Sequence, residues 1–256
     1  MGDIAFELKD GVALIRLSNP ARKNALSRSM VRELTRIALE LQENREIAAV
    51  VLTGDRASFS AGVDLREIAE WNKSPHDLEE RLVVSELGGK MCHAWEQVPQ
   101  ITIAAIEGFN VGGGIALTMT CDWRIMGRSS YLYVPEVQIG IPLVWQSMPR
   151  LINMIGLSRA KQVLLLGEKM PAAKALEWGL ADFVADDGDT VVYAERLARK
   201  VAAMPSLAVR VTKKSANNYA NHINQLASAM DVELSVLFST SQDAVHGRSR
   251  FERKND

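Results

Sequence analysis

Cysteine is scarce in this sequence, and several other features that define large classes of proteins are missing. The 256 residues contain two cysteines, Cys92 and Cys121. Two thiols make neither a disulfide framework nor a metal cluster, so reduced, buried thiols are expected. No apolar run is long enough to cross a bilayer, and there are no low-complexity tracts or repeats of fixed period. These absences argue against a secreted disulfide scaffold, a membrane-spanning protein and a repeat protein.

An excess of charge of one sign is also absent. The formal net charge is -1, which provides no electrostatic reason to expect nucleic acid or an anionic membrane as the main partner. The N-terminal stretch MGDIAFELKDG has no basic region, apolar segment or Arg-rich presequence of a targeting signal. Phe6 stands where N-myristoylation requires Ser or Thr. The expected location is therefore cytoplasmic.

What is present is an ordinary globular composition, with 47% apolar and 24% charged residues. This length forms one large domain, or one domain with an appendage. Strands are expected at residues 4–9, 12–17, 48–53, 101–106, 122–126 and 180–184. Helices are expected from the N-cap Ser27, at 77–95, 112–120, 155–166, 171–178 and 190–204, and from 206 to about 244 with a break near Asn217 and Asn218. The alternation predicts an α/β fold.

The chain is organised around residues 101–122, ITIAAIEGFNVGGGIALTMTCD. An apolar run is followed by three glycines, Gly112 to Gly114, and then by a helical pattern, so the glycines are expected where a strand passes into a helix. Unpaired N–H groups at such a junction can bind a negative oxygen. Close helix–sheet packing is an equally good explanation of the glycines. The two common nucleotide-phosphate loops are excluded, because neither Gly-Lys-Ser/Thr nor G-x-G-x-x-G occurs here.

A second loop, Phe59-Ser60-Ala61-Gly62-Val63-Asp64-Leu65, also follows an apolar strand and could present the Ala61 N–H to a ligand. The pair FSAGVDL and IEGFNVGGGIALTMTCD, in this order and separation, resembles the crotonase (enoyl-CoA hydratase/isomerase) superfamily. The resemblance implies that the two loops form an oxyanion hole, with Ala61 and Gly113 as donors, which binds an acyl-CoA thioester carbonyl. The substrate contacts that it implies are Arg22, Lys23, Ala25, Ala61, Gly62, Val63, Asp64, Leu65, Gly112, Gly113 and Trp145.

The same resemblance implies the architecture. We expect a crotonase-like spiral of ββα units, with residues 1–200 as the acyl-CoA-binding core and residues 201–256 as a C-terminal helical trimerisation region. Trimers that pair into hexamers are expected, with Phe251 to Lys254 as a tail near a neighbour's CoA. No metal, nicotinamide or flavin is implied, because coenzyme A is part of the substrate.

Glu136 is the predicted catalytic residue. It lies in an apolar segment after Pro135, where poor solvation should raise its pKa toward the range in which a carboxylate serves as base and acid. The position matches the second of two catalytic glutamates of the hydratases. Ala116 stands at the position of the first. With one carboxylate, a double-bond shift is the simpler chemistry, so the prediction is an enoyl-CoA isomerase. The alternatives are a hydratase that works with Glu136 alone or with a carboxylate supplied from elsewhere, for example Asp64 or Glu67, and a non-catalytic acyl-CoA-binding homologue.

Several further residues have two interpretations each. Arg22 and Lys23 either contact CoA phosphates or are solvated charges before a helix. Trp71, at the start of a polar stretch read as a mobile loop, is a pocket wall or a packing residue. Trp145 either closes the acyl pocket or packs at a helix start. The dehalogenase branch of the family needs an aspartate in the Trp145 loop, and none is present. His76 and His93 have no metal-ligand spacing and are interpreted as structural or exposed.

Overall fold

The computed structural model describes residues 3–239 and 241–247 and contains two sheets. The larger sheet has the strand order β1-β2-β3-β5-β7-β10. Its strands are β1 (Ile4–Lys9), β2 (Val12–Leu17), β3 (Ala49–Thr53), β5 (Ile101–Ile106), β7 (Trp123–Gly127) and β10 (Phe183–Ala185). Only the β1–β2 pair is antiparallel; the other neighbours are parallel. Parallel neighbours need crossover connections, and the helices supply them.

The smaller sheet positions the functional loops. Its order is β4-β6-β8-β9, with β4 (Ser58–Ser60), β6 (Phe109–Val111), β8 (Tyr131–Tyr133) and β9 (Met170–Pro171). Strands β4, β6 and β8 are parallel to one another, and β9 is antiparallel to β8. Each of the pairs β3/β4, β5/β6 and β7/β8 places one strand in the large sheet and the next in the small sheet. This repetition is the expected spiral of ββα units.

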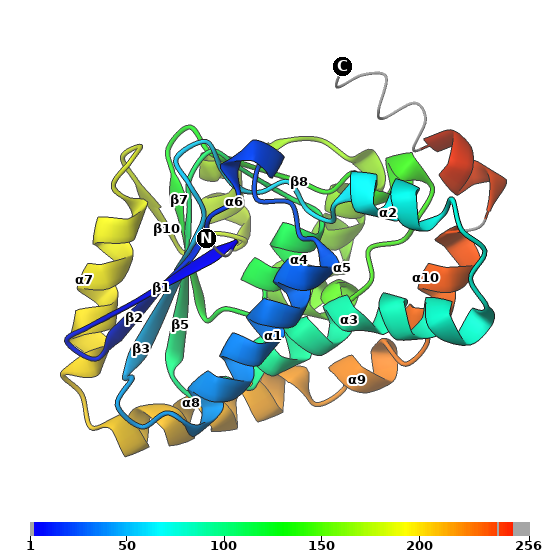
Figure 1. Ribbon diagram of the computed structural model, residues 1–256. Helices are drawn as coiled ribbons and strands as arrows, with labels where there is room; N and C mark the ends of the chain where they lie inside the picture. The colour runs from blue at the N-terminus through cyan, green and yellow to red at the C-terminus, as the bar shows by residue number, and fades with distance from the viewer. Residues whose placement is uncertain (1–2, 240, 248–256) are drawn as a thin grey trace.

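The helices cover both faces of the large sheet (Figure 1). They are α1 (Arg28–Glu43), α2 (Leu65–Trp71), α3 (Leu78–Glu96), α4 (Gly113–Thr118), α5 (Ser147–Leu166), α6 (Ala172–Trp178), α7 (Thr190–Ala202), α8 (Ser206–Asn221), α9 (Asn224–Ala227) and α10 (Asp231–Ser239), with short 3-10 helices η1 (Pro20–Arg22) and η2 (Glu136–Ile139). Helix α7 lies on one face, and α1 and α3 on the other.

Period-two alternation in the buried strands separates the core into two clusters. In β3, Val50 and Leu52 belong to the larger cluster, which includes the apolar faces of α1 and α3. The alternate residues Ala49 and Val51 join the cluster beneath α7. Every β3 residue is therefore buried, as expected for a parallel strand with helices on both faces.

Local signals in the sequence are realised at element ends. Asp10 and Gly11 both have positive φ, 51° and 74°, as a two-residue hairpin turn requires. The Ser27 side chain accepts a hydrogen bond from the Met30 N–H, which confirms it as the N-cap of α1. At the start of α3, Asp77 and Glu80 form a capping box. The hairpin turn and the starts of α1 and α3 therefore lie at residues whose own side chains or backbone preferences stabilise them.

Several boundaries differ from the sequence-based expectation; β10, for example, covers Phe183–Ala185 and not 180–184. Short strands β4 and β6 intervene between the long buried strands and the two loops, so β6, not β5, passes into the glycine-headed helix. Helix α5 begins at Ser147, eight residues before the expected start, with non-helical geometry at Gly156 (φ 78°). Helix α8 continues through Asn217 and Asn218 and ends at Asn221; the asparagines are half-exposed or exposed surface positions that a packed helix tolerates.

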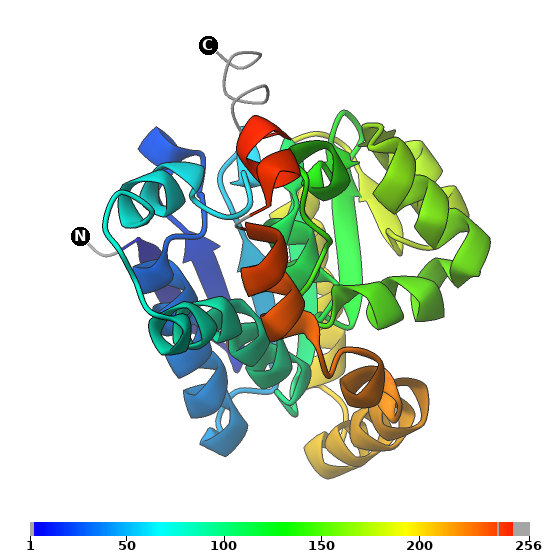
Figure 2. The same cartoon turned by 90° about the vertical axis from the view of Figure 1, so that its right-hand side faces the viewer.

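Helices α8, α9 and α10 lie outside the sheet layers, with α8 and α9 at the bottom of both views (Figures 1 and 2). Lys213 fixes α8 to the large sheet: its Nζ donates to the Gln100 carbonyl at 2.8 Å and to Asp122 Oδ2 at 2.6 Å. Helix α10 packs against α3. The chain thus returns to the side of the molecule on which α2 and α3 lie.

Candidate active site

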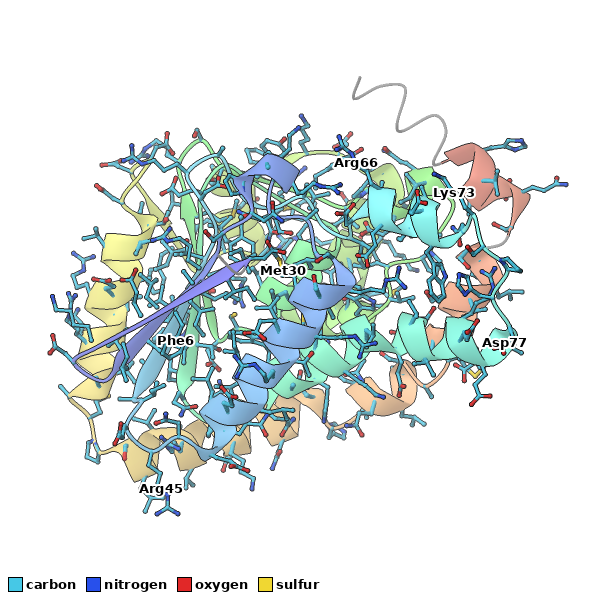
Figure 3. The ribbon with its side chains drawn as sticks, viewed as in Figure 1. Phe6, Met30, Arg45, Arg66, Lys73 and Asp77 are labelled. Atoms are coloured by element: carbon cyan, nitrogen blue, oxygen red, sulfur yellow. The ribbon has the colours of Figure 1, made fainter. Side chains whose placement is uncertain are left out.

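Three loops meet at one edge of the small sheet because β4, β6 and β8 are parallel and end there. Ala61 to Asp64 follow β4, Gly112 follows β6, and Pro135 and Glu136 follow β8. Residues of all three loops line one cavity of about 250 Å³, which is also bordered by α2, α3 and the segment 141–145. In Figure 3, Arg66 marks the start of α2, Lys73 lies two residues beyond its end, and Asp77 marks the start of α3. Residues separated by more than seventy positions thus share one site.

Glu136 faces this cavity from a buried position, with 8% of its surface exposed. Its Oε2 atom is buried and has no hydrogen-bond partner among the described residues. Burial raises the pKa of the Glu136 carboxyl from 4.5 to about 7, against the smaller opposing effect of a backbone hydrogen bond. Such a group can take up a proton and return it near neutral pH.

Gly112 is required beside this carboxylate. A Cβ at Gly112 would overlap Glu136 Oε1, and the residue has φ 48°. Glycine therefore serves two purposes here, because it adopts the backbone conformation and leaves room for the carboxylate. The glycine triplet is explained by the site as well as by packing: a Cβ at Gly114 would overlap the Asn110 side chain.

The Ala61 N–H does not face the cavity as a free donor. It donates to the Lys23 carbonyl at 2.9 Å, so the prediction that Ala61 holds a ligand oxygen is wrong. Lys23 has a left-handed backbone (φ 52°) within the turn that brings residues 19–26 against this loop.

The N–H groups of Val63 and Gly113, two residues that line the cavity, have no acceptor among the described residues. Leu26 forms backbone hydrogen bonds with both neighbours of Val63: its N–H donates to the Gly62 carbonyl, and its carbonyl accepts from the Asp64 N–H. Strand geometry turns the Val63 N–H the other way, and it has no acceptor in the described part of the chain. The Gly113 N–H, at the first position of α4, also lacks an acceptor within residues 3–239 and 241–247. The loops touch, since a Cβ on Gly113 would lie 3.3 Å from Val63 Cγ2.

The other two carboxylates that line the cavity, Asp64 and Glu67, form hydrogen bonds and ion pairs with other protein groups. Asp64 caps α2, accepting from the N–H groups of Arg66 and Glu67, and it pairs with Arg22 at 3.5 Å. Glu67 accepts from the backbone N–H of Arg28 at 2.8 Å and from its Nε at 2.7 Å. Ala116 lies in the wall of the cavity, buried and without a polar group. Among the described lining residues, Glu136 is the one carboxylate without such partners.

Trp71 and Trp145 both line the cavity. Trp71 stacks on His76, with ring centroids 3.3 Å apart, and the Arg28 guanidinium lies 4.4 Å from the Trp71 ring centroid. His76 therefore has the structural role that was expected. Trp145 lies against Gly88 and Gly113, and a Cβ at Gly88 would overlap its indole.

Some predicted residues lie outside the cavity wall. Arg22, Lys23 and Ala25 belong to the turn around η1, and their neighbour Leu26 reaches the cavity instead. Contacts of these three residues with CoA stay a prediction. The predicted tail, Phe251 to Lys254, lies outside the described residues. The remaining predicted contacts, Gly62, Val63, Leu65, Gly112, Gly113 and Trp145, all line the cavity.

Metal-binding groups do not gather in the part of the chain that the structure describes. No set of three or more His, Cys, Asp or Glu side chains there could hold a metal ion. Cys92 and Cys121 are buried free thiols, and burial raises the pKa of each to about 12. Within the same residues, no helix is long and apolar enough to span a membrane.

Sequence reasoning missed two parts of this site. Val63 was expected to contact substrate but not to provide the unpaired N–H, since the hydrogen bond between Ala61 and Lys23 leaves no signal in the sequence. Gly88 reads as an ordinary glycine in a helical pattern. Its adjacency to Gly89 is a weak signal, because two glycines in one helix interior cost stability unless a neighbour packs closely.

Comparison with known proteins gives a consistent result. The sequence-family model described as enoyl-CoA hydratase/isomerase matches residues 7–256. The short-chain-enoyl-CoA hydratase of Clostridium acetobutylicum is 30% identical over 218 residues, which cover 85% of this chain and 82% of that protein. The 2,3-dehydroadipyl-CoA hydratase of Escherichia coli is 28% identical over 257 residues, covering 99% and 97%.

Solved structures agree with the architecture. The crystal structure of an enoyl-CoA hydratase/isomerase from Mycobacterium paratuberculosis superimposes with a TM-score of 0.89 at 26% identity. The match covers 97% of this chain and 98% of that one. The crotonase-like fold expected from the two glycine-containing loops is therefore confirmed.

Proposed function

The chain is an acyl-CoA-processing member of the enoyl-CoA hydratase/isomerase family, and we propose that it moves a double bond along the acyl chain of an enoyl-CoA thioester. The observation that carries this proposal is that, among the described residues lining the cavity, Glu136 is the one carboxylate not held by a helix cap or an ion pair. Glu136 is buried, and no described residue forms a hydrogen bond with its Oε2. Ala116 supplies no second acid, and Asp64 and Glu67 are held by capping and by Arg28.

The proposed reaction is a proton transfer between two carbons. Glu136 removes a proton from C2 of a 3-enoyl thioester, and the electron pair of the broken C–H bond moves into the thioester to give a dienolate. The N–H groups of Val63 and Gly113 stabilise the negative oxygen. Glu136 then returns the same proton to C4, which leaves the double bond between C2 and C3. The N–H of one such donor contributes roughly 2.7 to 4 kcal/mol.

Hydration is the second candidate, and the names of the relatives favour it. Adding water across a double bond needs a group that holds and deprotonates the water while another proton reaches the α-carbon. The hydratases divide this work between two carboxylates. Here a hydratase would depend on Glu136 for both tasks, or would have to release Glu67 from Arg28 or Asp64 from the start of α2. Non-catalytic acyl-CoA binding is the third candidate, and the raised pKa of Glu136 argues against it.

The test is turnover of trans-3-hexenoyl-CoA, followed as formation of the conjugated 2-enoyl thioester, with trans-2-hexenoyl-CoA assayed beside it for hydration. We expect conversion of the 3-enoyl substrate, and a loss of roughly 10² to 10⁴-fold in Glu136→Gln. Because Glu136 must be deprotonated to act, kcat/KM should rise with pH and level off above about 7. Hydration without a double-bond shift would favour the second candidate, and binding without turnover the third.

Three accompanying features are part of the proposal. The chemistry needs no metal or redox cofactor, because a carboxylate moves the proton and CoA arrives with the substrate. Residues 201–256 are proposed to form the oligomerisation region of a homotrimer, or of a hexamer made of two trimers. Action in the cytoplasm remains the prediction of the sequence.

A further inference from the structure

Trp145 separates two cavities. It lines the catalytic cavity and also a second one, of about 570 Å³, on the far side of the segment 144–146. Side chains of α1, α3, α9 and α10 border the second cavity, among them Thr35, His93 and Asp231. Ser85, Val144 and Trp145 border both. The partition between the two spaces is therefore thin, and the indole is its largest side chain.

The indole fits between two glycines. A Cβ at Gly88, on α3, would overlap the indole, and a Cβ at Gly113 would lie 2.7 Å from Cζ3 and 2.9 Å from Cη2. Contacts this close leave no room for a side chain at either position. The absence of a side chain at both glycines thus makes room for the large planar indole between α3 and the N-terminus of α4.

The backbone that carries the indole is held from both sides. Trp145 and Gln146 have left-handed geometry, with φ 64° and 59°, which is unfavourable for residues with side chains. Arg150 donates to the carbonyls of Trp145 and Gln146 at 2.9 and 3.1 Å, and the Gln146 N–H donates to Asp231 at 2.7 Å. A buried ion pair with Glu96, at 2.8 Å, fixes Arg150. The surrounding structure therefore keeps this strained turn in place.

This position is close to the reacting atoms. The indole contacts Gly113, whose N–H is one of the two proposed donors to the thioester oxygen. An acyl chain that extends from that carbonyl toward α3 meets the ring within a few carbons. We propose that Trp145 is a specificity-determining residue that closes the acyl end of the catalytic cavity, so that the enzyme accepts short acyl chains and is shut off from the second cavity. This inference rests on the proposed function, because it takes the catalytic cavity to be the acyl-CoA site.

The test uses saturated thioesters, which bind without reacting and therefore do not depend on whether the protein is an isomerase or a hydratase. Dissociation constants of butyryl-CoA, hexanoyl-CoA and decanoyl-CoA are measured by calorimetry. The main variant is Trp145→Gly, because glycine removes the indole and relieves the left-handed backbone at φ 64°. Trp145→Phe is the second variant. Trp178→Phe is the matched control, since Trp178 lies on α6 and lines neither cavity.

The wild type is expected to bind butyryl-CoA and hexanoyl-CoA, and decanoyl-CoA at least about tenfold more weakly, as misfit in an apolar pocket usually costs. Trp145→Gly should bind decanoyl-CoA at least about tenfold more tightly than the wild type, with Trp145→Phe changed less in the same direction and Trp178→Phe unchanged. If Trp145→Gly does not fold, the Phe variant decides: tighter binding of decanoyl-CoA than by the wild type supports the role of Trp145, and unchanged binding overturns it.

Two other outcomes have distinct meanings. Equal affinity of the wild type for the three chain lengths, or no gain for decanoyl-CoA in the Trp145 variants, overturns the role of Trp145 and leaves the acyl-CoA site intact. Failure of the wild type to bind any of the three thioesters overturns the proposed function itself.

Discussion

Glu136 combines three properties: it is buried, its Oε2 has no hydrogen-bond partner among the described residues, and Gly112 lies directly against it. A group held this way destabilises the folded protein whenever it is charged. The unfolded chain pays no such cost, because there the carboxylate is solvated. The raised pKa proposed for catalysis therefore also makes the free energy of unfolding depend on pH, and this dependence can be measured without any substrate.

Glu136→Gln should stabilise the protein at alkaline pH and have little effect at acid pH. The folded pKa, about 7, lies above the value of 4.5 in an unperturbed glutamate. The stability of the wild type relative to the Gln variant is therefore fully present below pH 4.5, and is lost as the pH rises through about 7. The shift corresponds to about 3 kcal/mol at most. Urea unfolding of both proteins at acid pH and at pH 8 measures the difference between their free energies of unfolding. The contributions of all other titrating groups are common to both proteins and cancel in this difference. A difference independent of pH would contradict the raised pKa.

At the scale of the element, α3 contains two adjacent glycines with opposite surroundings. A Cβ at Gly88 would overlap the Trp145 ring, whereas a Cβ at Gly89 meets nothing within 4 Å. Helix propensity alone treats the two positions alike, favouring alanine over glycine by roughly 0.8 to 1 kcal/mol. The same glycine-to-alanine substitution should therefore change the free energy of unfolding in opposite directions at the two positions, because their tertiary packing differs.

Gly89→Ala should raise the free energy of unfolding by roughly 0.5 to 1 kcal/mol, and Gly88→Ala should lower it by about 1 to 3 kcal/mol because the methyl group overpacks the indole. Each variant is the other's control, since both add one methyl group to neighbouring residues of one helix. Chemical unfolding at one pH measures both values. A stabilising Gly88→Ala would mean that the indole does not lie against α3.

At the scale of the whole molecule, the C-terminal helices expose several large apolar side chains. The residues concerned on α8, α9 and the turns beside them are at least half exposed: Leu207, Val211, Tyr219, Ile223, Leu226 and Met230. Exposed apolar residues scattered singly are normal, but a continuous run of them marks an interaction surface. Helices α8 and α9 lie beside the sheet layers, at the bottom of Figure 2, which leaves their outer surface accessible to another copy of the chain.

We expect light scattering to give three or six times the 28.2 kDa mass of one chain. The double substitution Tyr219→Glu and Leu226→Glu should shift the mass toward that of one chain, because these residues are 86% and 80% exposed in the monomer and charges at the core of an interface are costly. Val192→Glu, at a 65% exposed position on α7, is the control that should keep the larger mass. A single-chain mass for the wild type would contradict the proposed assembly.

Local sequence signals were sufficient to predict those features of the structure that depend on a few neighbouring residues. Asp10-Gly11 determined the hairpin and Ser27 the start of α1, and apolar runs, alternating in the hairpin and continuous in the inner strands, marked the strands of the large sheet. The sequence was also sufficient to single out Glu136, because an acid beside Pro135 in an apolar segment is poorly solvated in almost any fold. The short strands β4 and β6 escaped prediction because three residues carry too little periodicity.

Tertiary structure alone decided which groups remain free. The sequence shows Ala61 and Val63 as near-equals, and only the hydrogen bond from Ala61 to Lys23 leaves the Val63 N–H unpaired. Similarly, only Arg28 removes Glu67 from the set of available acids. Trp145 meets Gly88 although the two are far apart in the chain. A sequence thus determines which chemical groups exist and how each local segment begins and ends, whereas their hydrogen-bond partners and neighbours depend on contacts between distant segments, which exist only after the chain has folded.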